Sequence, residues 1–112
     1  MLILIGDKDY NDASRCKKRV EELRADGADV DLVIYPNAYH CFLASFPVKL
    51  VNTPVYRDCG TKVLYKEMGY AGRINVRVRG AQCVKKQGMC GGNYTAQKDA
   101  LERVVGFFTR HL

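Results

Sequence analysis

The chain has 112 residues and a net charge of +6, and its apolar (47%) and charged (27%) fractions are ordinary for a soluble globular protein. It contains no run of about 18 apolar residues, a pattern that excludes a transmembrane helix. The start, MLILIGDKD, lacks the basic leader of a signal peptide, so we expect a cytoplasmic protein with a single domain, 1–112.

The pattern of residues 1–45 predicts a strand, a helix and a second strand. The apolar run Leu2–Ile5 is typical of a strand buried on both faces in a parallel sheet. Asn11 or Asp12 can cap the following helix. The apolar residues of that helix recur at spacings of three and four: Ala13, Cys16, Val20 and Leu23. The second strand is Val30–Tyr35, which completes a βαβ unit.

Two turns follow the strands of this unit. Gly6–Asn11 follows the first strand and Pro36–Phe42 follows the second. The strands of a βαβ unit are parallel, so both turns lie at the carboxyl edge of the sheet, where open α/β sheets bind ligands. We therefore expect Asp9 and His40 to approach each other.

Residues 46–92 form a basic, glycine-rich insertion. Nine Lys or Arg residues and two acids give the segment a charge of +7. Lys62–Met68 has the length of a short helix or strand, and Ile74–Arg79 alternates apolar and basic residues as a half-exposed strand does. The basic block could bind anions or nucleic acid, but it carries no nucleic-acid motif. We expect a solvated surface and no nucleic-acid partner.

The segment 93–112 predicts a closing helix. Thr95 can cap it, and Ala96–Leu112 forms it. Its apolar face consists of Leu101, Val104, Val105, Phe108 and Leu112, widened by Ala100 and Phe107. A face this broad packs against a sheet or a partner chain.

The five cysteines are Cys16, Cys41, Cys59, Cys83 and Cys90. Their number is odd and no two of them form a C-x-x-C motif, which argues against a disulfide framework and a structural zinc site. We expect free thiols, and neither a metal nor a cofactor.

Several segments resemble the C-terminal part of the dienelactone hydrolase family of α/β-hydrolases. They are LILIGDKD, the later RADGADVDLVIYPNAYHCF, and the closing NYTAQKDALERVVGFFTRHL. The resemblance covers Leu2–Phe42 and Asn93–Leu112, somewhat over half the chain. It depends most on the G-x-x-D of Gly6–Asp9 and on the Y-P-x-A-Y-H that precedes Cys41. It implies a truncated α/β-hydrolase-like sheet.

By this resemblance, Asp9 is the acid and His40 the base of a catalytic triad. An imidazole that titrates near neutrality suits general-base catalysis, and a carboxylate on its other nitrogen fixes the tautomer. Asp9 precedes His40, as the order of this superfamily requires. The simpler interpretation is an Asp that caps a helix and a His that ends a strand.

The nucleophile is where the chain departs from the family. The elbow G-x-S-x-G or G-x-C-x-G should precede the acid, but only six residues precede Asp7, and Ser14 and Ser45 lie in no elbow. Gly88–Gly92 matches G-x-C-x-G, which makes Cys90 a weak nucleophile candidate. It follows the histidine, however, and a glycine-rich turn explains it better. Cys41 neighbours His40, but adjacent side chains on an extended chain point apart.

Three functions remain open from the sequence. The first is an ester or lactone hydrolase of dienelactone hydrolase type that lacks its usual elbow, with a small ester or lactone as substrate. The second is a non-catalytic binding or assembly module derived from a hydrolase. The third is an anion or nucleic-acid binder. Because two strands alone leave edges and an apolar face uncovered, we also expect a homodimer.

Overall fold

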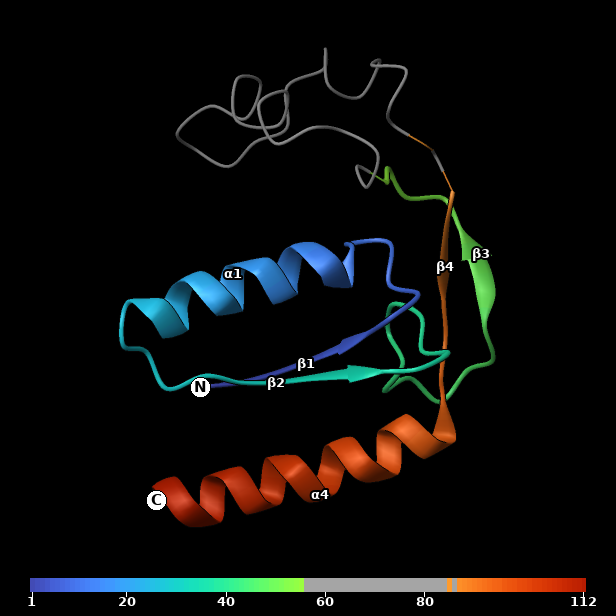
Figure 1. Cartoon of the computed structure of the whole chain (residues 1–112). Helices are drawn as coiled ribbons and strands as arrows, with labels where there is room; N and C mark the ends of the chain where they lie inside the picture. Colours follow the sequence, from blue (N-terminus) through green and yellow to red (C-terminus); the bar gives the residue numbers. More distant parts are fainter. Residues whose placement is uncertain (56–84, 86) are drawn as a thin grey trace. The chain divides into compact units, whose positions relative to one another are not determined.

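The computed structural model describes residues 1–55, 85 and 87–112 (Figure 1). In chain order the elements are β1 (Leu2–Gly6), α1 (Ala13–Ala25), β2 (Asp31–Tyr35), β3 (Lys49–Val51), β4 (Gly88–Cys90) and α4 (Tyr94–His111). The chain divides into two compact units, one of Met1–Lys49 with Met89–Leu112 and the other of Leu50–Gly88. The result is a small α/β fold.

The βαβ unit forms as predicted. β1 and β2 are parallel and pair from Leu2 with Asp31 to Gly6 with Tyr35. Asp12 caps α1, because its carboxylate accepts the N–H of Ser14 at 3.1 Å. The side chains of β1 are half-buried, not buried on both faces as expected. Among the described residues β1 has a paired strand on one side only, which explains the difference.

Two helices cover opposite faces of this sheet (Figure 1). α1 lies against β2, and α4 lies across the other face. The buried cluster beneath α4 joins the end of β2 to the following loop and to two alanines of the helix. It contains Tyr35, Ala38, Phe42, Ala96 and Ala100, with Leu4 and Val33 packed against it.

α4 differs from the prediction in its cap and its buried face. Asn93, not Thr95, caps the helix by accepting the N–H of Ala96 at 3.0 Å. The small Ala96 and Ala100 lie against the sheet, because they allow the helix to approach closely. Most of the predicted apolar face is exposed instead: Leu101, Val105, Phe108 and Leu112.

A second sheet pairs β3 with β4. Gly88–Cys90 is therefore extended, and the expected glycine-rich turn before α4 was wrong for these three residues. The pairing of β3 with β4 joins residues about forty positions apart, which local turn signals do not reveal. The predicted elements Lys62–Met68 and Ile74–Arg79 lie outside the described residues.

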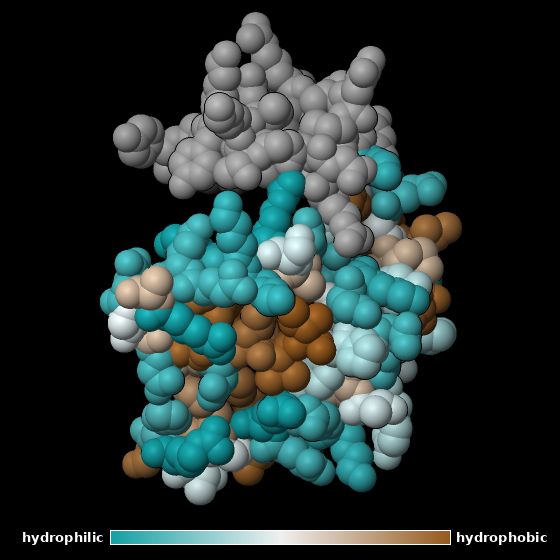
Figure 2. Space-filling view, viewed as in Figure 1, coloured by the Kyte–Doolittle hydropathy of each residue, from teal (hydrophilic) through white to brown (hydrophobic). Residues whose placement is uncertain are grey.

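Figure 2 shows apolar side chains gathered between α1 and α4, bordered by hydrophilic ones. Ile34, at the outer side of β2, is 37% exposed. A fully covered sheet would not show such a patch, so the two helices leave the β2 side of the sheet only partly closed. Within the described residues no helix has the length and hydropathy to cross a membrane.

Candidate functional site

The two loops at the carboxyl edge of the sheet meet where Gly6 passes Ala38. A side chain at Gly6 would collide with the carbonyl oxygen of Ala38, so only glycine permits this approach. Ala38 itself is fully buried. Two bonds hold the loops together: the N–H of Asp7 donates to Tyr35 O at 2.9 Å, and that of Lys8 to Ala38 O at 3.0 Å.

The Asp9 carboxylate is fixed by its own loop. Its Oδ1 accepts the backbone N–H of Asn11 at 2.8 Å, which is an Asx turn. Its backbone C=O accepts the N–H of Asp12, the cap of α1, at 3.1 Å. Asp9 is 7% exposed, and a buried carboxylate needs such partners. The second oxygen, Oδ2, is thereby directed away from the turn.

His40 meets this second oxygen. The distance from its Nδ1 to Asp9 Oδ2 is 3.0 Å, so the expected approach of the two side chains is confirmed. A carboxylate can only accept, so Nδ1 carries the proton in the neutral imidazole and Nε2 is the basic nitrogen. The side-chain nitrogen of Asn11 is also 3.3 Å from Nδ1, and with this tautomer its amide would turn its oxygen toward the ring.

The remaining atoms of the imidazole are partly open to solvent. The His40 side chain is 35% exposed, while that of Asp9 is 10% exposed. The Tyr10 ring lies against the imidazole with 4.4 Å between the centroids. Among the described residues, the hydrogen bonds of the ring involve Nδ1 alone. Of the two ring nitrogens, Nε2 is thus the one without a hydrogen-bond partner among the described residues.

The backbone of His40 is held by the distant segment that leads into α4. Its C=O accepts the N–H of Gly91 at 2.9 Å, in a parallel bridge to Cys90. Farther along the loop, the Gln97 amide donates to Phe42 O at 3.0 Å and to Ala44 O at 2.7 Å. Residues about fifty positions later thus fix the loop that carries the histidine.

Cys90, the weak nucleophile candidate, is the partner of His40 in this bridge. It is 6% exposed, and burial raises the pKa of its thiol to about 11, aided by a hydrogen bond with Cys41 and by the Asp9 charge. Lys49 acts in the opposite direction but does not prevail. A thiol attacks as the thiolate, so at neutral pH Cys90 is a poor nucleophile.

The serines offer no better nucleophile. Ser14 Oγ donates to Asp12 at 2.6 Å in the cap of α1, and Ser45 is exposed in the loop before β3. Most of the basic residues of the 46–92 insertion, including Arg73–Arg79, lie outside the described residues. Within the described part of the chain no three His, Cys, Asp or Glu side chains gather as metal ligands do.

The sequence interpretation missed three contributors to this site. Tyr10 packs against the imidazole, Asn11 holds Asp9, and Gly91 holds the His40 backbone. The Asx turn was detectable, because Asp followed by a backbone N–H two residues later is a common turn signal. The Gly91 contact had no local signal. No family model, curated protein or solved structure matches this chain.

Proposed function

We propose that this chain is an ester or lactone hydrolase of the dienelactone hydrolase type, with His40 as general base and Asp9 as the carboxylate that orients it. The contact that supports the proposal is the 3.0 Å hydrogen bond between His40 Nδ1 and Asp9 Oδ2. It lies at the carboxyl edge of a parallel sheet, where α/β proteins bind their ligands. The substrate is a small ester or lactone.

The two nitrogens of the His40 imidazole have different roles. Nδ1–H donates to Asp9, so Nε2 accepts a proton from the attacking group. The imidazolium that forms is stabilised by the Asp9 carboxylate, which is itself held by the Asn11 N–H. The Tyr10 ring limits the orientations of the imidazole. A partly buried carboxylate is more effective in this role because water screens it less.

The attacking group is water or a nucleophile from another chain. Cys90 is buried and its pKa is raised to about 11, which keeps it protonated. Water activated at Nε2 would attack the acyl carbon, the C–O bond of the ester or lactone would break, and the imidazolium would return its proton to the leaving oxygen. This route suits activated esters and strained lactones, whose leaving groups depart easily.

The alternative is a non-catalytic assembly module that retains the pair. The buried, protonated Cys90 and the exposed apolar residues of α4 favour it. In that case Asp9–His40 would serve only to join the two loops. The two functions differ in whether substitution of Asp9 changes a rate or only the stability.

Hydrolysis of p-nitrophenyl acetate and of a small lactone by the full chain tests the proposal. His40→Ala should lower the rate by roughly 100-fold, since general-base catalysis contributes about 10²–10⁴. Asp9→Asn should give a loss of similar order at unchanged pH, because Nδ1 then has no anionic partner. Cys90→Ala should leave the rate within about twofold.

His111→Ala is the matched control. His111 is an exposed histidine near the end of α4 that packs on Phe107, and it reports the background reaction of a surface imidazole with the ester. If His40→Ala and His111→Ala lower the rate equally, or if Asp9→Asn changes only the unfolding midpoint, the chain is not a hydrolase. Loss of the rate in Cys90→Ala without loss of folding would instead make Cys90 the nucleophile.

A further inference from the structure

The outer edge of β1 carries backbone groups that point away from β2. The Asp31 N–H donates to Met1 O at 2.8 Å and the Asp7 N–H to Tyr35 O at 2.9 Å. These two bonds show which residues of β1 direct their N–H and C=O groups toward β2. Because successive residues of a strand alternate sides, Leu2 and Leu4 direct their N–H and C=O groups outward. Within the described residues no strand pairs with this edge. An open edge is a template for another strand.

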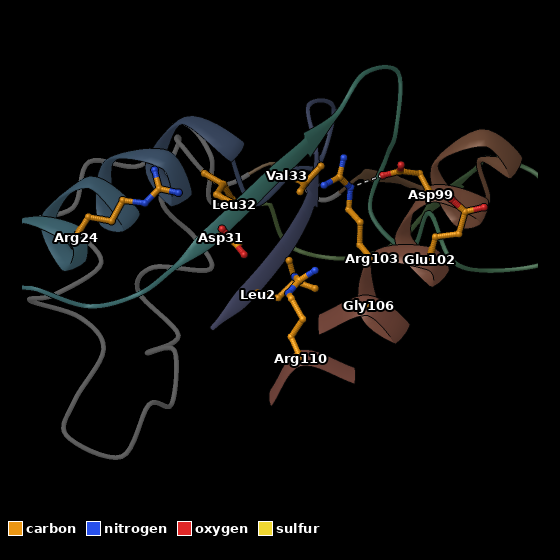
Figure 3. Close-up of a pocket in the computed structure, with 10 residues that line it drawn as sticks. All are labelled: Leu2, Arg24, Asp31, Leu32, Val33, Asp99, Glu102, Arg103, Gly106 and Arg110. Carbon is orange, nitrogen blue, oxygen red and sulfur yellow. Dashed lines mark hydrogen bonds and ion pairs between the residues drawn. The ribbon is translucent and has the colours of Figure 1, made fainter. Parts of the chain in front are cut away.

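The outer edge of β2 also borders exposed apolar surface at Ile34, but charged side chains lie beside it. The Arg24 guanidinium donates to Val30 O at 2.9 and 2.7 Å, just before this strand begins. Arg103 pairs with Asp99 at 2.6 Å on the flank of α4 that faces β2 (Figure 3). Arg110 lies on the same polar flank. Charges at an edge oppose the pairing of a further strand.

The flank of α4 toward β1 is apolar. A hollow on this side is lined by Met1 and Leu2 of the β1 end and by Val104, Phe107 and Phe108 of the helix. Beside it runs an exposed stripe at helical spacing: Leu101 (66% exposed), Val105 (57%), Phe108 (52%) and Leu112 (100%). This α4 stripe and the open edge of β1 therefore lie on the same side of the unit.

We propose that a second copy of this chain docks on this side, with the two β1 strands paired antiparallel across a two-fold axis and the two α4 stripes packed against each other. The axis lies near Leu4, whose N–H and C=O would bond those of the partner's Leu4. The sheet then continues through four strands, β2–β1–β1–β2. The inference does not depend on the proposed hydrolase activity.

Simple geometry shows that one axis satisfies both contacts. Paired strands lie about 4.8 Å apart. A helix that covers the β1–β2 pair is centred about one strand spacing from the axis, so the two copies of α4 would lie about 10 Å apart. Packed helices are separated by about 8–10 Å. The same lateral position of the second copy therefore allows both the strand pairing and the helix contact.

The exposed area is in the range that a dimer needs. The α4 stripe leaves on the order of 400 Å² of apolar surface in water, the size of the largest patch on a typical monomer, which is often functional. A stable interface buries about 800 Å² per partner, and the paired strands with Met1 and Leu2 would supply the rest.

Sedimentation equilibrium of the full chain between about 1 and 100 μM tests the proposal. The wild type should be a dimer, and Phe108→Glu should raise the dissociation constant by at least about 100-fold, because it replaces a large apolar side chain of the α4 stripe with a charge that the interface would bury. Arg110→Glu, on the polar flank, is the matched control and should leave the dissociation constant unchanged. A monomeric wild type, or equal effects of the two variants, would overturn the inference.

A second measurement covers the case in which Phe108→Glu does not fold. Leu101→Cys, next to the Ala100 that packs with Leu4, should form an intermolecular disulfide under mild oxidation much faster than Arg110→Cys, whose thiol would face away from the partner. Amide hydrogen exchange on the wild type should show Leu2 and Leu4 protected in a concentration-dependent manner. Protection at Leu32 and Ile34 instead would place the interface at β2 and contradict the proposal.

Discussion

The two loops that form the candidate site are stabilised in different ways. The Asp9 loop is held by short-range bonds, from the Asp9 N–H to Gly6 O at 3.2 Å and from the Asn11 N–H to the Asp9 carboxylate at 2.8 Å. The His40 loop is held by Gly91 and Gln97 of the segment that enters α4. The acid therefore depends on local chain geometry, whereas the base depends on the docking of the last helix.

This difference shows which contacts each loop of the site needs in order to form. A loop fixed by its own backbone survives changes elsewhere, because its hydrogen bonds form with little loop-closure entropy. A loop fixed by a segment fifty residues later forms only when that segment docks. Variants that act on one loop, or on the contact that both share, therefore separate the two contributions.

Gly6→Ala should have the largest effect, because it acts on both loops. The new methyl group would collide with the Ala38 carbonyl and push the loops apart. We expect a loss of about 3 kcal/mol in the free energy of unfolding, measured by denaturant titration, since overpacking costs about 1–3 kcal/mol or more. Gly27→Ala is the control. Gly27 has φ +88°, and among the described residues beyond its chain neighbours none lies within 4 Å of the position of the new methyl group, so only backbone strain of about 1 kcal/mol applies. Equal losses would show that the loops do not touch.

Gln97→Ala should have the next largest effect, and only on the His40 loop. It removes two hydrogen bonds to the carbonyls of Phe42 and Ala44, which together contribute about 2 kcal/mol. Asn11→Ala on the Asp9 loop should change the free energy of unfolding by less than about 0.5 kcal/mol, because the backbone N–H, not the side chain, holds Asp9. Thermal unfolding followed by circular dichroism compares the two. A larger loss for Asn11→Ala would reverse the assignment of local and distant support.

The same distinction explains what could be predicted from the sequence. The strand–helix–strand unit, the Asp12 cap and the approach of Asp9 to His40 follow from local patterns and from the rule for parallel strands. The extended Gly88–Cys90 and its bridge to His40 do not, because they depend on pairing between distant residues. Periodicity found the α4 helix but not which face is buried, since a hydrophobic pattern does not distinguish a core face from a docking face.

The anchor of α4 to β2 should have the smallest effect and the clearest pH dependence. The Tyr35 hydroxyl donates to Asp99 Oδ2 at 2.8 Å, and the same oxygen accepts from Arg103 at 2.6 Å. Burial and the bond to Asp99 raise the pKa of Tyr35 to about 12, and Arg103, with help from Tyr35, lowers the pKa of Asp99. We expect Tyr35→Phe to cost about 1 kcal/mol at pH 7, measured by denaturant unfolding.

The cost of Tyr35→Phe should vanish at both ends of the pH range. The raised pKa of Tyr35 means that its contribution to stability is complete below pH 10, where the unfolded phenol is protonated, and is lost as the pH rises toward 12. The lowered pKa of Asp99 means that its contribution holds above about pH 4 and is lost as the carboxyl is protonated below that value. Tyr39→Phe, on the neighbouring loop, is the control. A difference between Tyr35→Phe and wild type that stays constant from pH 7 to 11 would show that the Tyr35–Asp99 bond does not form.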